Sequence, residues 1–458
     1  MNFKLLSILT LSIVILSGCN SGGSSDNDDS TGPVVPEEDV ITQIRIESKY
    51  YPDGFEQSLQ NNMDYFIDGV GVSTSAHIPF DHVLVNDGEV TPSNYTNIST
   101  IALYINVLIQ MIEFGDEAAA TRLSTVLSTL ENAPKWNGLF YWLYQIEGAG
   151  LTIDDSAIAS AVDNGIMSFT LAGLYGALNN HTDESLNQLS IRAEALLNEQ
   201  ITGWSVLYDS NQGYLRAGWD NNAFAYLPYY LDRKANESRL ATLWAVMMTS
   251  GQVPNTAYTD MTLVRGQVSN DGLNVTPMLT WDGSYFQAIL PALWLDESSL
   301  MPSYEMVEEF TQVHLQYADE YNIPLVSASS TIDDGYAAFG LESVSESHRK
   351  YSNSIETGTT GTPHALALYY MLSPTDAIQR LNQLKLTYPN IETAAGWVDA
   401  IDSSGQVSSK VIGLDQGMFV GAFFADSVRE NVATYIDFKG QTSTLQTLYS
   451  TFVADEIL

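Results

Sequence analysis

The chain has 458 residues, of which 55 are acidic and 18 are basic, giving a net charge of −37. This charge repels the phosphates of nucleic acids and anionic lipid headgroups, so nucleic acid is excluded as an expected partner. Cys19 is the only cysteine, so the sequence predicts neither a disulfide nor a cysteine metal site.

The first 18 residues predict the signal peptide of a lipoprotein. Lys4 precedes an apolar stretch from Leu5 to Leu16 that is too short to span a bilayer as a mature helix. The following LSGC resembles a lipobox, where cleavage leaves a lipid-modified cysteine; the alternative is an ordinary secretory signal with a chance cysteine. We expect lipidation at Cys19 and a place in the bacterial cell envelope. Asn20 favours the outer membrane, with the domain in the periplasm or at the cell surface.

Residues 19–44 predict a flexible acidic tether, because their small and polar side chains cannot bury enough apolar surface to form a core. No later apolar run is long enough to cross a membrane, so the lipid is the expected membrane contact. The remaining residues, 45–458, are expected to form one domain, and we expect a monomer.

A series of helices is predicted from apolar residues at helical spacing. Residues 98–114 are apolar nearly all round, as in a buried helix, and Pro374 after Ser373 is a helix-start signal. The predicted helices cover residues 98–114, 117–130, 157–178 with a break near 163, 186–198, 238–249, 304–321, 363–371, 374–387, 416–424 and 428–438.

Long connections rich in Gly, Asp and aromatic residues separate these helices, for example at 201–224 and 265–285. Their length indicates that they carry the function, and they have room for short strands. Buried helices alternate with amphipathic ones, and no linker interrupts them. A single two-layered helical toroid explains this alternation better than two domains do.

The candidate chemistry rests on carboxylates. The histidines lack metal-ligand spacing, and neither a nucleophile elbow nor a phosphate-binding loop occurs, so we expect no metal and no cofactor. Several acids instead stand among aromatic and glycine residues, as glycoside hydrolysis requires: one carboxylic acid protonates the leaving oxygen and one carboxylate activates water or attacks the sugar. Five stretches have this character, namely AVDNGI with Asp163, KANESRL with Glu237, WDGSYF with Asp282, IDDGYAAFG with Asp334, and AGWVDAID followed by IGLDQGM with Asp399 and Asp415.

Each stretch also has a purely structural interpretation. Asp163 can be a hydrogen-bonded core residue, Glu237 and Arg239 an ion pair at a helix start, and Asp399 a capping residue. The order of all five along the chain favours the functional interpretation.

This order resembles the glucoamylase-like domain of bacterial lipoproteins, including the endo-β-1,2-glucanases of glycoside hydrolase family 144 and the cyclic β-1,2-glucan synthases. The resemblance spans about residues 60–438 and also rests on NESRLATLWAV, FQAILPALWL, YNIPLVSAS and GTTGTPHALA. It implies an all-α fold, an (α/α)6 barrel with long functional loops and the site at one end.

The resemblance also implies roles for individual residues. Catalytic roles fall on Glu237, Asp415 and Asp163, and sugar-binding roles on Arg239, Trp281, Asp282, Ser327, Ser329, Asp334, Tyr336 and Asp399. One departure stands out, because Gln287 occupies a position where the family usually carries Glu, and an amide cannot transfer the proton.

The expected function is therefore hydrolysis of a glucan, β-1,2-glucan in particular, with inversion. Glu237 is the expected general acid, since an apolar and aromatic surrounding raises the pKa of a carboxyl, although Arg239 would oppose this. Asp415 or Asp163 is the expected base. The alternatives are a non-catalytic lipoprotein that binds an oligosaccharide and passes it to a transporter, and a polysaccharide lyase, which the small number of basic residues disfavours.

Overall fold

The computed structural model describes residues 40–270 and 272–458. The predicted signal peptide, Cys19 and most of the predicted tether lie outside the described residues. The predicted tether, residues 19–44, extends too far along the chain, because Ile41 and Ile44 are buried in the hydrophobic core. The backbone of Ile41 also exchanges hydrogen bonds with Asp68.

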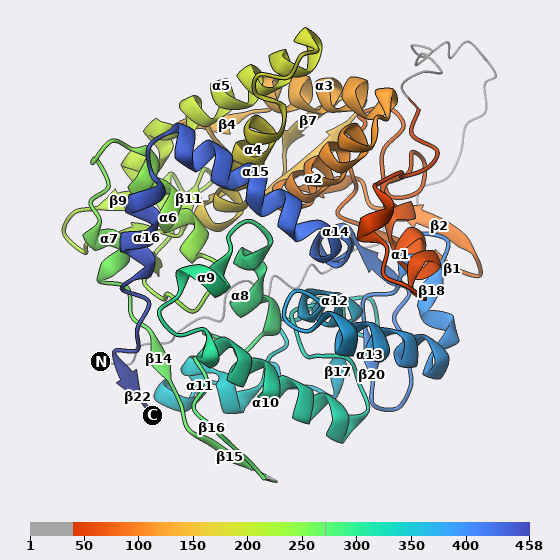
Figure 1. The fold of residues 1–458 in the computed structure, drawn as a ribbon, viewed down its shortest axis with the longest axis vertical. Helices are drawn as coiled ribbons and strands as arrows, with labels where there is room; N and C mark the ends of the chain where they lie inside the picture. Colours follow the sequence, from red (N-terminus) through yellow and green to blue (C-terminus); the bar gives the residue numbers. More distant parts are fainter. Residues whose placement is uncertain (1–39, 271) are drawn as a thin grey trace.

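Helices surround the middle of the molecule in two tiers (Figure 1). The inner helices are α2 (Ile98–Phe114), α4 (Ala161–Leu178), α6 (Arg239–Met248), α8 (Tyr285–Ile289), α12 (Pro363–Tyr369) and α14 (Gly413–Gly421). Further out lie α1 (Glu56–Met63), α3 (Glu117–Asn132), α5 (Glu184–Leu207), α7 (Thr256–Thr259), α10 (Glu305–Tyr321), α13 (Pro374–Thr387) and α16 (Thr442–Tyr449). The remaining helices are α9 (Glu297–Leu300), α11 (Glu346–Tyr351) and α15 (Ala425–Phe438).

Helix α15 lies across the C-terminal half of α4 (Figure 1). A Cβ atom added at Gly176 would come within 1.9 Å of the carbonyl oxygen of Asn431, so only glycine permits this approach. The C-terminal end of α4 is therefore covered, while its N-terminal end carries the site described below.

The expectation of an all-α fold is wrong in one respect, because short strands of two to five residues build the connections between helices. Such short pairs satisfy backbone groups within long connections without forming a central sheet. The strands are β1 (His82–Asn86), β2 (Glu89–Pro92), β3 (Tyr95–Asn97), β4 (Lys135–Trp136), β5 (Leu139–Phe140), β6 (Leu143–Glu147), β7 (Gly150–Ile153), β8 (Ile158–Ser160), β9 (Tyr208–Asp209), β10 (Tyr214–Arg216), β11 (Gly218–Asp220), β12 (Ala225–Tyr226), β13 (Tyr230–Leu231), β14 (Val264–Arg265), β15 (Val268–Asn270), β16 (Leu273–Val275), β17 (Thr360–Gly361), β18 (Glu392–Thr393), β19 (Gly396–Trp397), β20 (Ile401–Asp402), β21 (Lys410–Ile412) and β22 (Glu456–Ile457).

The strands pair mainly with neighbours in antiparallel register. The three-stranded groups run β2-β1-β21, β13-β10-β9, β12-β11-β8 and β3-β6-β7. Two of these groups join distant parts of the chain, since β1 pairs with β21 and β8 pairs with β11. They hold the N-terminal ends of inner helices in place, because β21 runs into α14 and β8 runs into α4.

The structure confirms several predicted helices and corrects others. Helix α2 has the predicted bounds, since Asn97 caps its first turn and Gly115 ends it in the left-handed conformation. The predicted helix at 157–178 is not broken near 163; it begins at Ala161, after β8. The connection predicted from residue 201 is helical up to Leu207, and the helix predicted from 416 begins three residues earlier.

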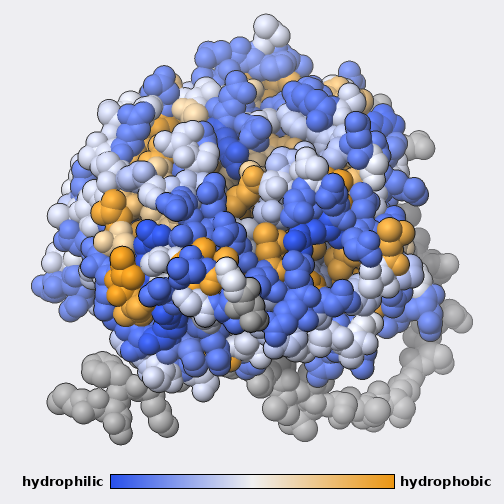
Figure 2. Space-filling model, turned by 60° about the horizontal axis from the view of Figure 1, so that its bottom comes forward, coloured by the Kyte–Doolittle hydropathy of each residue, from blue (hydrophilic) through white to orange (hydrophobic). Residues whose placement is uncertain are grey.

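One contiguous hydrophobic core includes residues from Ile41 to Phe452. The face seen in Figure 2 is mostly hydrophilic, with apolar side chains exposed singly or in small groups, as the acidic composition leads one to expect. Within residues 40–270 and 272–458, none of the helices has the length and apolar character that a bilayer crossing requires.

Candidate active site

Polar and charged side chains gather at the N-terminal ends of the inner helices. The residues are Ser99 in α2, Asp163 in α4, Glu237 just before α6, Asp282 just before α8, His364 in α12 and Asp415 in α14. Helix N-termini carry partial positive charge and free N–H groups, which stabilise carboxylates. The fold therefore brings together acids that are 250 residues apart in the sequence.

Asp163 lies in the first turn of α4 and has hydrogen-bond partners. Its Oδ1 accepts from the hydroxyl of Ser99 at 2.7 Å, and its backbone N–H donates to the Ser160 hydroxyl. Gly165 lets α4 approach α6, because a Cβ there would lie 2.7 Å from the backbone nitrogen of Ala241. Burial is the main cause that raises the pKa of Asp163.

Glu237 has the electrostatic setting of a proton donor. Burial raises its pKa from 4.5 to about 7, and the charges of Asp282 and Asp163 add to this effect. The charge of Arg239 lowers the pKa but does not prevail. Glu237 therefore keeps its proton up to about neutral pH, as a general acid must.

Asp282 is held by Gln287, the residue that departs from the family pattern. The amide nitrogen of Gln287 donates to Oδ2 of Asp282 at 3.2 Å, and its oxygen accepts from the Asp282 backbone at 3.2 Å. Burial raises the pKa of Asp282 to about 6. A glutamate at position 287 would set a second carboxylate against Asp282, whereas the amide orients it without adding charge.

His364, Asp399 and Asp415 form a buried cluster in which one ligand atom from each lies within 4.8 Å of the others. The Nδ1 atom of His364 is 3.3 Å from Oδ2 of Asp415 and 3.9 Å from Oδ1 of Asp399. Burial alone would lower the pKa of His364, but the two carboxylates outweigh it and raise the pKa to about 9. The imidazole is therefore charged at neutral pH.

The two acids of this cluster have opposite pKa shifts. Burial and the charge of Asp399 raise the pKa of Asp415, against the effect of His364. Burial alone would raise the pKa of Asp399 as well. Hydrogen bonds from His364 and from the Ser330 backbone, the latter at 2.6 Å, instead lower it. Asp399 is thus held as the anion, whereas the raised pKa of Asp415 makes its carboxylate, once ionised, the stronger base of the two.

The same three residues have the donor atoms that a metal ion would require. In this structure the distances from His364 to the two carboxylates are those of an ion-paired triad.

Tyr336 lies within the field of two groups of acids, one with Glu237 and the other with Asp399 and Asp415. Burial of its hydroxyl raises its pKa, and so do the charges of Asp415, Asp399, Asp81 and Glu237. The residue as a whole is 57% exposed. Tyr336 therefore lies within the field of acids from both groups and is open to solvent.

Two carboxylate oxygens stand out among the described residues, because they are buried and lack a hydrogen-bond partner. They are Oε2 of Glu237 and Oδ2 of Asp415. The latter lies beside Nδ1 of His364, which is 2.8 Å from the Thr362 hydroxyl and is not aligned on the carboxylate. Leaving such atoms without hydrogen-bond partners costs free energy, and both oxygens are free to accept a hydrogen bond from a ligand or from water.

Arg239 does not have the sugar-binding position expected of it. Its guanidinium forms a bidentate pair with Glu297, at 2.7 Å for both contacts. The other donors bind the carbonyls of Ala235, Asn236 and Ala288, and the side chain is fully buried. No donor remains for a substrate, so Arg239 anchors the start of α6.

Three further predicted sugar-binding residues act within the protein. Ser327 is fully buried and accepts from the Phe286 backbone at 3.1 Å, and Ser329 is fully buried in a bridge with Ala337. Asp334 accepts both the backbone N–H and the hydroxyl of Ser409, at 2.8 and 2.6 Å. These contacts hold the loop that carries Tyr336.

Trp281 is half-buried between two side chains. The guanidinium of Arg233 lies 5.3 Å from its ring, and the ring of Tyr351 lies 5.7 Å away. Its position next to Asp282 in the chain keeps it close to that acid.

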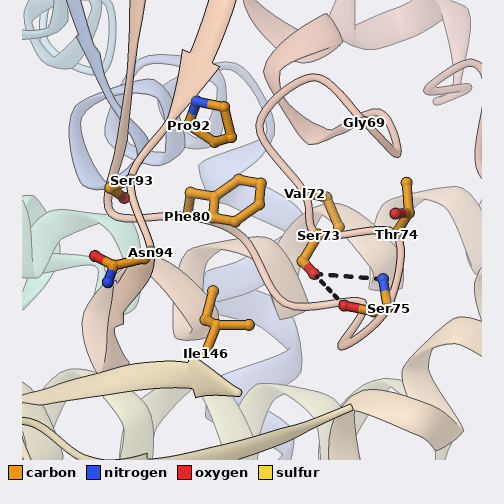
Figure 3. Close-up of a pocket in the computed structure, with 10 residues that line it drawn as sticks. All are labelled: Gly69, Val72, Ser73, Thr74, Ser75, Phe80, Pro92, Ser93, Asn94 and Ile146. Carbon is orange, nitrogen blue, oxygen red and sulfur yellow. Dashed lines mark hydrogen bonds between the residues drawn. The ribbon is translucent and has the colours of Figure 1, made fainter. Parts of the chain in front are cut away.

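A pocket of about 420 Å³ is lined by residues within 69–94 and by Ile146 and includes none of the acids described above (Figure 3). Its lining contains hydroxyl, amide and apolar groups and no charged side chain: Gly69, Val72, Ser73, Thr74, Ser75, Phe80, Pro92, Ser93, Asn94 and Ile146. An uncharged lining of this kind suits a neutral, hydroxyl-bearing ligand.

Sequence reasoning missed His364, because its spacing from other histidines was considered only for metals. The available signal was GTTGTPHALA, in which Pro363 marks a helix start and thus places His364 in the first turn. Ser99 was missed as well, since a serine in an apolar helix carries no sequence signal for a distant aspartate.

No protein-family model and no curated protein matches the sequence. Solved structures do match. An endo-β-1,2-glucanase from Talaromyces funiculosus, in complex with β-1,2-glucan, has a TM-score of 0.77 at 14% identity, covering 89% of this chain and 91% of the other. An endo-β-1,2-glucanase from Chitinophaga pinensis, in complex with sophorotriose and glucose, has a TM-score of 0.69 at 15% identity, covering 86% and 96%. A β-1,2-glucanase from Parabacteroides distasonis has a TM-score of 0.63 at 14% identity, covering 88% and 60%. The chain thus shares its fold with β-1,2-glucanases.

Proposed function

We propose that this protein is a glycoside hydrolase that cleaves a neutral glucan, with its inner and outer helices forming an (α/α)6 barrel. The observation that carries the proposal is the pair of buried carboxylate oxygens without hydrogen-bond partners, on Glu237 and Asp415. Two acids in different electrostatic surroundings are what hydrolysis of a glycosidic bond requires.

Glu237 is the proposed general acid. Its proton passes to the glycosidic oxygen as the bond from that oxygen to the anomeric carbon breaks. A pKa of about 7 keeps the carboxyl protonated at neutral pH and allows it to give up the proton in the transition state.

Asp415 is the proposed general base. It takes a proton from the water that attacks the anomeric carbon, so the configuration at that carbon inverts. The imidazolium of His364 favours the ionised form of Asp415, whereas burial makes the ionised carboxylate a stronger base. Asp163 is the less suitable base, because Ser99 already donates to its carboxylate.

β-1,2-Glucan is the proposed substrate. Support comes from the three solved structures described as β-1,2-glucanases. A uronic acid polymer, as a lyase would bind, is disfavoured by the net charge of −37.

The test is release of reducing ends from β-1,2-, β-1,3- and α-1,4-glucans. We expect release from β-1,2-glucan, and loss of about 10³-fold or more in kcat for Glu237→Gln and Asp415→Asn. Exposed Glu430 on α15 offers a matched control, Glu430→Gln, that should retain full activity. Binding of glucan without release of reducing ends would favour a glycan-binding lipoprotein instead.

We also propose that lipid on Cys19 holds the domain at the cell envelope, as its sequence context suggests. Incorporation of labelled palmitate into the wild-type protein, and not into Cys19→Ser, tests this. Equal labelling of both would refute it.

A further inference from the structure

A hairpin with exposed aromatic side chains projects between β11 and β13, at residues 218–230, and is called here the aromatic hairpin. Phe224 is 77% exposed, and Tyr226 and Tyr229 are 37% and 38% exposed. Exposed aromatic rings grouped on one short segment mark a binding surface more often than scattered ones do.

The rings at the base of the aromatic hairpin are held rigidly. Trp219 stacks on Trp136 with centroids 5.1 Å apart and an interplanar angle of 11°. Tyr226 packs edge-on against Trp219 at 5.2 Å, and the guanidinium of Arg216 covers Tyr226 at 4.7 Å. A stacked and braced platform loses little conformational freedom when a ligand binds.

The backbone at the tip presents Phe224 outward. Its φ is +50°, a conformation that bulky L residues rarely adopt. The turn is fixed by Asp220, whose Oδ1 accepts from the backbone of Asn222 and Ala223 at 2.8 and 2.9 Å. A large apolar ring in a strained and exposed position indicates a function outside the core.

The aromatic hairpin is joined to two segments that carry acids of the site. At one end Gly218 pairs with Ser160, the residue that caps α4 just before Asp163, and the Ala217 carbonyl accepts from the Ala161 backbone at 2.8 Å. At the other end β13 leads directly along the chain to Glu237. The base of the platform therefore lies at the start of α4, the helix that carries Asp163.

We infer that the aromatic hairpin is an outer sugar-binding platform, on which the part of a glucan chain beyond the cleaved bond stacks against Phe224 and Tyr226. This inference rests on the proposed function. The surface suits a neutral chain, since the hairpin's one acid, Asp220, is engaged in the turn. A net charge of −37 opposes docking of the same rings on an anionic membrane.

The experiment compares long and short substrates in Phe224→Ala and in Phe114→Ala. Phe114 is 49% exposed and ends α2, a helix of 17 residues whose other end, at Ser99, lies at the acids. At 1.5 Å per residue, the steps from Ser99 to Phe114 place the control site about 22 Å from the acids. Phe224→Ala should raise KM for polymeric β-1,2-glucan about fivefold to tenfold, with kcat on sophorotriose unchanged within about twofold. Phe224→Trp, which keeps an aromatic ring, should have a KM for the polymer close to that of the wild type. A merely structural role of Phe224 would not explain this result.

A second readout separates this inference from the proposed function. In the Glu237→Gln background, retardation in gels containing β-1,2-glucan measures binding without hydrolysis. Weaker retardation on adding Phe224→Ala, and not on adding Phe114→Ala, supports the platform even if the wild-type protein releases no reducing ends. Equal retardation of all variants overturns it. So does an effect of Phe224→Ala on co-sedimentation with phosphatidylcholine vesicles that leaves glucan binding unchanged, since a lipid surface would then be the ligand.

Discussion

Replacing Glu237 by Gln should abolish turnover and at the same time stabilise the protein at high pH. In the folded protein the pKa of Glu237 is raised from 4.5 to about 7. The unfolded chain therefore loses this proton at lower pH than the folded protein does, and the free energy of unfolding falls as pH rises from 4.5 to 7. At about 1.36 kcal/mol for each unit of pKa, the shift of Glu237 lowers the free energy of unfolding by about 3 kcal/mol. This loss is complete above about pH 7.

Glutamine carries no proton to lose, so the variant should escape this decline. The free energy of unfolding of the variant minus that of the wild type should be about 3 kcal/mol larger at pH 8 than at pH 4. For a domain of this size that corresponds to a rise in Tm of about 3 to 4 °C. The assay is thermal or denaturant unfolding at both pH values, with Glu430→Gln as the control.

A Glu237→Gln variant that lost activity but kept the wild-type pH dependence of stability would refute the reasoning. It would mean that Glu237 is already ionised in the folded protein near pH 5, so that it could not donate a proton at neutral pH. The wild-type activity profile provides a second check, because kcat/KM should fall above about pH 7 as the acid loses its proton.

Three further perturbations follow from the site. Arg239→Ala leaves a buried carboxylate partner without its cation and should destabilise the fold by about 3 to 5 kcal/mol in urea unfolding; a change confined to KM would contradict this. His364→Gln removes the charge that lowers the pKa of Asp415, so the acidic limb of the kcat profile should move to higher pH while kcat drops about tenfold to 100-fold; an unmoved limb would count against the triad. Gln287→Glu sets a second carboxyl against Asp282 and should lower the Tm at pH 8 but not at pH 4; equal effects at both would show that charge is not the cause.

The sequence predicted the helices well where local signals are complete. Residues 98–114 form a helix with the predicted bounds because the apolar run, the Asn97 cap and the terminal Gly115 all lie within the segment. The same holds for residues 374–387, which begin with Pro374. The start of α14 was placed too late, because Gly413 and Leu414 carry no local helix signal and their conformation depends on β21 pairing with β1.

The sequence alone determined that acids stand among aromatic residues at the starts of helices, since composition, spacing and capping are local properties. Only the tertiary structure decided the partner of each acid. Arg239 pairs with Glu297, 58 residues away, and not with nearby Glu237, and His364 joins Asp399 and Asp415 from a different helix. Burial and charge at each carboxyl depend on these distant neighbours, and so the difference between a structural acid and a proton donor arises only when the chain is folded.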